Sequence, residues 1–263
     1  MSAATPRRRA EETPDEPTHR VGIVVALVSE ARALAPELSA RPGRPDPIQS
    51  FAGAALTVSG MGAVRAAAGA RRLVEAGATA LASVGTAGAL DPGLESGAIV
   101  LPQEVVTIEG GSVATDLRWR EALAAALPRA RLSAGRLLST GMPIALRLDK
   151  AIARRETDGV AVDMESAAIA GVAAETGLPF VAVRVIVDTA ADDLPSAVLA
   201  ASRAGQVSGV RLLAALARAP WEIVALIRLA GRFRTACRVL AGIGEPGLAA
   251  RRALTEVDRE AEH

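Results

Sequence analysis

The stretch Val160–Asp193, VAVDMESAAIAGVAAETGLPFVAVRVIVDTAADD, indicates the fold class of this chain. The apolar run Val160–Val162 predicts a strand, and the alanine-rich Ala167–Thr176 predicts a helix that the following Gly-Leu-Pro ends. Phe180–Val187 is a β-branched run typical of a buried parallel strand. A strand, a helix and a second strand in succession indicate an α/β fold.

Two carboxylates follow the two strands of this stretch. Glu165 comes just after the first strand, and Asp188 comes just after the second. Because ligands of open α/β sheets bind at the carboxyl ends of strands, we expect both side chains at one crevice, where a carboxylate pair favours acid–base chemistry. Each residue alone also has a simpler interpretation, since Glu165 can complement a helix dipole and Asp188 can form a turn.

The composition excludes several classes of protein. The chain has 263 residues, 50% of them hydrophobic, a mean hydropathy of +0.28 and a formal net charge of +1, so it can form a sizeable core. The balanced charge argues against a general nucleic-acid binder, and the scarcity of aromatic residues removes the stacking platforms of single-strand binders. No apolar run reaches the roughly 18 residues of a membrane-spanning helix. Residues 1–20 lack the apolar segment of a secretory signal and are expected to be a disordered tail.

Histidine and cysteine are scarce. His19 and His263 are the only histidines and lie in polar terminal segments, so neither a Ser-His-Asp triad nor a histidine-ligated zinc site is expected. The single Cys237 excludes an intrachain disulfide and favours the reducing cytoplasm. Lys150 is the only lysine among 30 Lys and Arg residues, which we attribute to genomic composition. Chemistry is therefore expected from carboxylates, hydroxyls and backbone groups.

Strands and helices alternate along the rest of the chain. Further strands are expected at Val21–Leu27, Ala54–Ser59, Thr79–Val84, Gly97–Pro102, Val105–Ile108 and Arg131–Leu138. Helices are expected in four places: directly after Ser29, after Gly60-Met61-Gly62 up to about Ala76, at Leu117–Ala126 and at Asp149–Glu156. Ser29 is expected to cap its helix, and the strand after Thr79 to end at the glycine loop Gly85-Thr86-Ala87-Gly88. The pattern predicts one catalytic domain over 21–205 with a mixed, largely parallel sheet flanked by helices, a helical extension over 206–243 and a charged tail over 244–263.

Five pieces of sequence occur in an order that resembles a known superfamily. They are VGIVVALVSEARAL from Val21, VSGMGAVRAAAGARRL from Val58, VGTAGALDPGLESGAIVLP from Val84, and the two halves of the opening stretch. Together, over about Val21 to Ser196, they resemble the nucleoside phosphorylases and nucleosidases, particularly the 5′-methylthioadenosine/S-adenosylhomocysteine nucleosidases. The resemblance implies their single-domain α/β fold, a homo-oligomer such as a dimer, and no metal or organic cofactor.

The resemblance also implies roles for residues of the opening stretch. Glu165 would bind the ribose hydroxyls through charge-assisted hydrogen bonds, Met164 would pack against the sugar, and Asp163 would belong to the same substrate-binding group. Asp188 would protonate N7 of the departing purine. That role needs a protonated carboxyl group, so burial should raise the pKa of Asp188.

The glycine loop has roles by the same resemblance. Gly85 and Gly88 would let backbone amides approach the ligand, and Thr86 would contact ribose or phosphate.

Two other positions indicate whether water or phosphate is the nucleophile. Hexameric phosphorylases place arginines where this chain has Glu30 and Ser83, whereas nucleosidases carry a glutamate at the first place to deprotonate water. Glu30 therefore favours hydrolysis, because a carboxylate repels phosphate but accepts a proton from water; its simpler interpretation is a solvated residue of a first helical turn. Arg32 or Arg65 could still reach a phosphate, so phosphate stays open as a co-substrate.

Two departures from the nucleosidase pattern affect base recognition. Val187 stands where a serine usually precedes the catalytic aspartate. Residues 139–150 contain no aromatic side chain to stack on adenine. Base recognition is therefore expected from Met142, Ile144 or a partner subunit.

The C-terminal extension is basic and amphipathic. Val210 to Ile243 carries six arginines and one Glu among apolar residues that include Trp221 and Phe233, and Pro220 is expected to divide it into two helices. Such a segment fits a membrane interface, but a core-facing helix with a solvated arginine face fits equally well.

This extension, with SVGTAGALDPGL and AVDMESAAIA, most resembles the hopanoid-associated phosphorylase subgroup. That resemblance implies release of adenine from adenosylhopane by a cytoplasmic enzyme that contacts the inner membrane face peripherally through residues 210–243. The alternatives are a soluble 5′-methylthioadenosine/S-adenosylhomocysteine nucleosidase or purine nucleoside phosphorylase and, in another class, an inactive purine sensor or membrane-docked scaffold.

Overall fold

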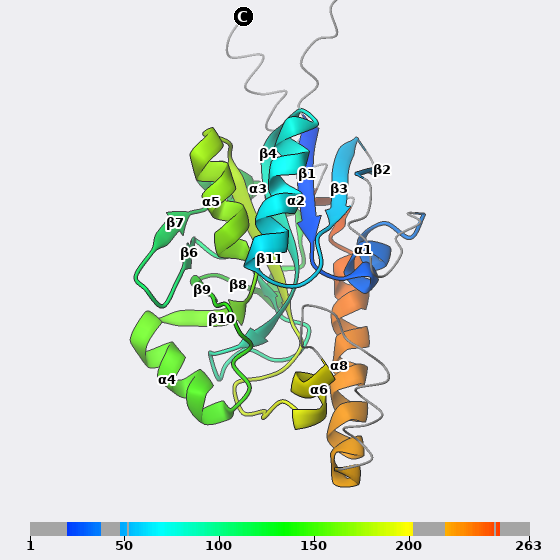
Figure 1. Cartoon of the computed structure of the whole chain (residues 1–263), viewed down its shortest axis with the longest axis vertical. Coiled ribbons are helices and arrows are strands. Elements are labelled where there is room, and N and C mark those ends of the chain that lie inside the picture. Colours follow the sequence, from blue (N-terminus) through cyan, green and yellow to red (C-terminus); the bar gives the residue numbers. More distant parts are fainter. Residues whose placement is uncertain (1–19, 38–47, 52, 202–218, 245, 248–263) are drawn as a thin grey trace, which may run out of the picture.

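The computed structural model describes residues 20–37, 48–51, 53–201, 219–244 and 246–247, which form one sheet with helices on both faces (Figure 1). The strands are β1 (Arg20–Val25), β2 (Gln49–Phe51), β3 (Ala54–Val58), β4 (Ala78–Ala89), β5 (Ile99–Val100), β6 (Glu104–Val106), β7 (Ser112–Ala114), β8 (Leu132–Ser133), β9 (Arg136–Ser139), β10 (Gly159–Asp163) and β11 (Phe180–Ile186). The helices are α1 (Val28–Leu34), α2 (Ala63–Glu75), α3 (Leu117–Ala126), α4 (Arg147–Thr157), α5 (Ser166–Thr176), α6 (Ser196–Ala201) and α8 (Ile223–Ala241), with 3₁₀ turns η1 (Arg129–Arg131) and η3 (Pro220–Glu222). The predicted α/β class, with a mixed and largely parallel sheet in one domain and a C-terminal helix, is confirmed.

The longest strand, β4, joins the two halves of the sheet. It pairs in parallel with β1 and β11, and its last residues, Gly88 and Ala89, pair antiparallel with β10. The prediction that this strand ends at a glycine loop is wrong, because pairing with β11 and then β10 carries it through that segment. Glycine is needed there for close approach: a Cβ at Gly85 would lie 2.9 Å from Glu30 Oε1, and one at Gly88 would lie 3.0 Å from Asp188 Oδ2.

Apolar side chains fill the space between the sheet and the helices on both faces. On one face the strands pack against α1, α3 and α8, which bury Leu34, Trp119 and Leu240. On the other face α2 and α5 lie next to each other and bury Leu73 and Ile169 (Figure 1). Because β1, β4 and β11 run parallel, their carboxyl ends meet at one edge of the sheet.

Helix α1 begins differently from the prediction. It starts at Val28 with Leu27 at its N-terminal cap, so Ser29 lies inside the helix and does not cap it. Instead, Glu30 Oε2 accepts hydrogen bonds from the backbone amides of Ala26 and Leu27, at 3.2 and 2.9 Å. The first turn is thus closed by a carboxylate that also belongs to the candidate site described below.

Helix α8 is part of the packed structure. Ala236 and Leu240 of α8, and Ile243 after it, are buried in the core with α1 and α3. At the other end, the Glu222 carboxylate accepts hydrogen bonds from the first residues of α6. A core-facing helix is therefore the correct interpretation for the C-terminal half of α8.

Parts of the predicted organisation lie outside the described residues: the tail over 1–19, the stretch 202–218 and the C-terminal 248–263. In the described part of the chain, no helix is both long and apolar enough to cross a membrane.

Candidate active site

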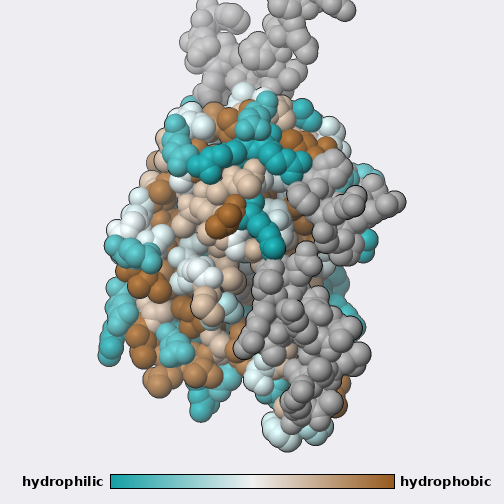
Figure 2. Space-filling view, in the orientation of Figure 1, coloured by the Kyte–Doolittle hydropathy of each residue, from teal (hydrophilic) through white to brown (hydrophobic). Residues whose placement is uncertain are grey.

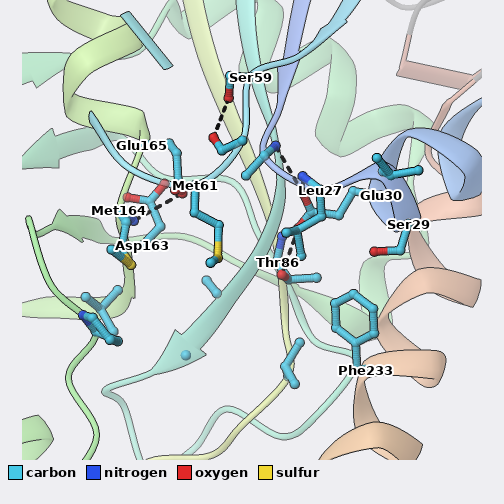
Figure 3. A pocket seen from close by; sticks show the side chains of 18 of the residues that line it. Leu27, Ser29, Glu30, Ser59, Met61, Thr86, Asp163, Met164, Glu165 and Phe233 are labelled. Carbon is cyan, nitrogen blue, oxygen red and sulfur yellow. Dashed lines mark hydrogen bonds between the residues drawn. The ribbon is translucent and has the colours of Figure 1, made fainter. Parts of the chain in front are cut away.

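A cavity of about 1270 Å³ opens at the carboxyl ends of β1, β4 and β11, between α8 and the start of α5 (Figure 3). Its wall contains most of the predicted site residues, namely Glu30, Thr86, Gly88, Asp163, Met164, Glu165 and Asp188. Gly85 is not part of the wall but lies against the Glu30 carboxylate. The fold thus brings together side chains that are far apart in the sequence.

Glu30 is buried, and hydrogen bonds from this chain hold its carboxylate. Oε1 accepts from the backbone amide and the hydroxyl of Thr86, both at 2.8 Å, while Oε2 accepts from the two amides at the start of α1. Burial raises the pKa of Glu30, and the hydrogen bonds and the charge of Arg184 oppose this rise. A carboxylate with a raised pKa is a stronger base, so Glu30 is suited to accept a proton.

Glu165 lies at the start of α5 and faces the cavity beside Met61 and Met164 (Figure 3). Its Oε1 accepts a 2.7 Å hydrogen bond from the Gly62 amide, which ties α5 to the start of α2. Burial and the negative charge of Asp163 raise the pKa of Glu165 to about 7. Glu165 can therefore accept hydrogen bonds from hydroxyl groups in its ionised form, which becomes the major form above that pH.

Asp188 follows β11 and contacts a buried lysine. Lys150 of α4, whose side chain is 0% exposed, donates to Asp188 Oδ2 at 2.5 Å and to the carbonyl oxygens of Thr189 and Asp192, both at 2.9 Å. Burial raises the pKa of Asp188, and the Lys150 ammonium opposes this rise. The carboxyl group is thus a candidate proton donor held beside a fixed positive charge.

Asp163, in the cavity wall, forms a buried ion pair with Arg184. Nε and Nη2 of Arg184 donate to Asp163 Oδ2 at 2.9 and 2.6 Å. Nη2 also donates to the hydroxyls of Ser83 and Ser166, at 2.5 and 2.8 Å. Ser83 is therefore buried against Arg184 and does not line the cavity.

The four buried carboxyl groups of the site differ in what stabilises their charge. Two of the buried carboxylates, Asp163 and Asp188, have a cation in direct contact. Glu30 and Glu165 are held by backbone amides and a hydroxyl instead, and burial is the largest influence on the pKa of each. The site therefore contains two carboxyl groups whose pKa values are raised chiefly by burial, which suits them to exchange protons.

The rest of the wall is largely apolar. Phe233 of α8 points into the cavity across from Met61 and Met164 (Figure 3). Of the residues expected to recognise the base, Ile144 lines the cavity, whereas Met142 is 76% exposed and is not part of the wall.

A comparison with models of protein families identifies the family of this chain. The model described as "Phosphorylase superfamily" matches residues 20–218. The chain belongs to the phosphorylase superfamily. No curated protein matches the chain at a significant level.

Solved structures with the same fold include members with named activities. The 5′-methylthioadenosine/S-adenosylhomocysteine nucleosidase of Neisseria meningitidis, in complex with methylthio-immucillin-A, is 21% identical with a TM-score of 0.66. The futalosine hydrolase of Helicobacter pylori is 15% identical with a TM-score of 0.67. A mutant nucleosidase of the same organism, with 5′-methylthioadenosine in the active site, is 14% identical with a TM-score of 0.67. Each alignment covers 88% of this chain and 98% of the other, and at these identities the likeness shows the fold.

Three residues of this superfamily member's site were missed in the sequence. Arg184 was counted as part of an apolar strand, although a charged residue inside a buried run signals a buried partner. Lys150 was attributed to composition, although a single lysine in an arginine-rich chain is a signal in its own right. Phe233 lay in the extension, and nothing in its local pattern indicated which cavity it would reach.

The raised pKa of Glu165 predicts how the stability of the folded protein depends on pH. Glu165→Gln is expected to stabilise this superfamily member more at pH 8 than at pH 5. The pKa is about 7 in the folded protein, against an ordinary value of 4.5. The unfolded chain therefore loses this proton at lower pH, and the wild type loses stability as pH rises between these two values. Glutamine stays neutral and can still accept from the Gly62 amide.

Thermal unfolding of both proteins between pH 5 and pH 8 tests this, with Glu75→Gln on the exposed face of α2 as the control. Parallel curves for wild type and Glu165→Gln would contradict the raised pKa.

Proposed function

We propose that this protein is a nucleosidase that releases adenine from a purine nucleoside by hydrolysing its N-glycosidic bond. The observation that carries the proposal is the arrangement of Asp188, Glu165 and Glu30 around one cavity. The named nucleosidases and the futalosine hydrolase among the similar structures support the same reaction class.

Four carboxyl groups have separate tasks in the proposed reaction. Asp188 donates a proton to N7 of the purine, so that the bond between C1′ and N9 can break with its electron pair moving to the base. Glu165 holds the ribose hydroxyls, with Met164 against the sugar, while C1′ develops positive charge. Asp163, paired with Arg184, fixes the backbone at the start of α5 through its hydrogen bond with the Ser166 amide at 3.0 Å.

Glu30 activates the water through Thr86 in this proposal. The Glu30 carboxylate already accepts four hydrogen bonds, two on each oxygen. About four is the acceptor capacity of a carboxylate. The water therefore binds to the Thr86 hydroxyl, which passes a proton to Glu30. Arg32 and Arg65 also line the cavity, so phosphate is the alternative acceptor.

The size and lining of the cavity favour a nucleoside with an apolar 5′ group. Its volume of about 1270 Å³ exceeds the ~300–1,000 Å³ typical of small-molecule sites. Leu226, Leu229 and Phe233 of α8 and Val198 of α6 add apolar side chains to its wall. We therefore propose adenosylhopane as the substrate, leaving a ribosyl-hopane after adenine has departed, as the resemblance to the hopanoid-associated subgroup implies.

The start of α8 supports a peripheral membrane contact. Trp221, Val224 and Ile227 are exposed next to the exposed Arg228. An apolar surface with tryptophan and arginine is suited to a membrane interface. In this arrangement the lipid part of the substrate enters the cavity along α8.

A second exposed apolar surface supports the proposed homodimer. Apolar side chains gather over α4 in the space-filling view (Figure 2), and the exposed ones there are Met142, Leu146, Leu148 and Ile152. Pairing of two copies through this surface would remove it from water.

The proposed function predicts adenine release that does not require phosphate. Purified protein is incubated in detergent with adenosylhopane and, in parallel, with 5′-methylthioadenosine, each with and without phosphate. We expect faster release from the lipid-linked nucleoside and no phosphate requirement. Glu30→Gln should lower the rate by ~10²-fold or more, because it removes the base, whereas Glu75→Gln should not change it.

Each other outcome favours a different candidate. Strict dependence on phosphate would make the protein a phosphorylase and contradict the role of Glu30. Equal or faster cleavage of 5′-methylthioadenosine would favour a soluble nucleosidase. Tight adenine binding without any release would favour the inactive sensor or scaffold.

A further inference from the structure

Lys150 is the most unusual buried charge in the described part of the chain. It is the only lysine of the sequence, it lies on the inner face of α4, and its side chain is fully buried. An isolated ammonium group in such a place is costly, so its contacts must compensate for the loss of water.

The contacts of Lys150 match the charged form of its side chain. An ammonium group has three N–H donors, and three acceptors surround Nζ: Asp188 Oδ2 at 2.5 Å and the carbonyl oxygens of Thr189 and Asp192, each at 2.9 Å. A neutral amine has only two donors and would leave one acceptor without a proton. The geometry therefore holds a positive charge against one oxygen of Asp188.

The same geometry explains why this position is a lysine in a chain rich in arginine. The three acceptors converge on a single nitrogen, which suits a compact ammonium group. A planar guanidinium spreads its donors over three nitrogens and cannot bring all three acceptors to one point. Genomic composition, our explanation from the sequence, accounts for the arginines but not for this exception.

We propose that Lys150 is a positioning residue that directs the acidic proton of Asp188 to Oδ1 and stabilises the carboxylate left after that proton has moved to the purine. The proposal rests on the proposed nucleosidase function. Lys150 occupies Oδ2, which leaves Oδ1 to carry the proton. When Oδ1 gives its proton to N7 and the C1′–N9 bond breaks, Asp188 becomes an anion beside the Lys150 ammonium group. A proton from solvent restores Asp188 after the base has left.

Other charged groups near Asp188 also influence its pKa. The Asp192 carboxylate, which contacts Arg232 of α8 and the backbone amide of Thr189, raises the pKa of Asp188 by its negative charge. Lys150 from α4 opposes that effect. The loop after β11 is therefore bound to α4 on one side and to α8 on the other, with Asp188 between them.

A purely structural role for Lys150 is the alternative, since it also holds two carbonyl groups of this loop. The two roles predict different effects of the leaving group on the loss of rate when Lys150 is replaced. Stabilising the Asp188 anion matters only for a base that must be protonated at N7. Holding the loop matters equally for every substrate that uses the cavity.

The test compares two substrates with the same apolar 5′ group, 5′-octylthioadenosine and the corresponding p-nitrophenyl riboside. p-Nitrophenolate leaves without protonation at N7. In Lys150→Met, the ratio of kcat/KM for adenine release to that for p-nitrophenol release is expected to fall by about 30-fold or more. The alkaline limb of the pH profile for adenine release should move to higher pH, because Asp188 without its cation holds its proton more tightly.

Lys150→Arg provides the second variant, since it keeps a cation beside Asp188. Its alkaline limb is expected to stay near that of the wild type even if its rate falls. If Lys150→Met does not fold, Lys150→Gln replaces it in both measurements, because glutamine is neutral but can still donate hydrogen bonds to the loop carbonyls. Equal losses on both substrates with unmoved pH limbs would overturn the proposal and leave Lys150 as a structural anchor. A wild type that cleaves neither substrate would instead contradict the nucleosidase function itself.

Discussion

Asp188→Asn is expected to lower adenine release by ~10²–10⁴-fold, the usual contribution of a general acid. Asparagine cannot donate a carboxylic proton to N7, although its side-chain oxygen can still accept the hydrogen bond that Lys150 gives to Oδ2. The variant should therefore keep the fold while losing the chemistry. Adenine release measured together with the melting temperature separates the two effects.

Two comparisons make the Asp188→Asn result specific. Asp193→Asn alters an exposed carboxylate in the same loop, whose known contact is with the Arg147 amide outside the cavity wall, and it should retain activity. Release of p-nitrophenol from a riboside should fall much less than release of adenine in Asp188→Asn, because that leaving group needs no protonation. Full adenine release by Asp188→Asn would refute the assignment of the acid.

The opening stretch could be interpreted correctly because its signals are local. Helix α5 ends at Gly177, whose φ of 68° is the left-handed conformation that glycine favours after a helix. The β-branched run after it became β11, which ended one residue earlier than predicted. Periodicity and helix-ending residues depend on neighbours in sequence, so they predicted these elements without knowledge of the fold.

Other features depended on contacts between distant segments. The glycines of β4 predicted a loop locally, but pairing with strands on both sides overrode that preference. Lys150 contacts Asp188 across 38 positions of sequence, and Arg184 contacts Asp163 across 21. Neither partner can be chosen from a single sequence, because many carboxylates are available and only the fold selects one. Most of the predicted site residues thus line one cavity, while the cations that balance them came from the structure.

Arg184→Met is expected to destabilise the protein by about 3–5 kcal/mol, which is the usual cost of leaving one charge of a buried pair without its partner. Side-chain exposure is only 3% for Arg184 and 1% for Asp163, so water cannot replace the lost contact. Methionine has a similar length and no charge. The free energy of unfolding, measured with denaturant, gives the loss directly.

The matched control is the exposed pair of Arg71 and Glu175, whose side chains are 53% and 61% exposed. Arg71→Met should cost at most about 1 kcal/mol, because solvent screens such pairs. Adding Asp163→Asn to Arg184→Met should recover part of the stability, since the uncompensated charge is then removed. A loss below about 1 kcal/mol in Arg184→Met would contradict the buried ion pair with Asp163. In that case Arg184 would be the counter-charge of Glu30 and Glu165, whose pKa values it lowers, and its loss would appear in the pH dependence of catalysis instead.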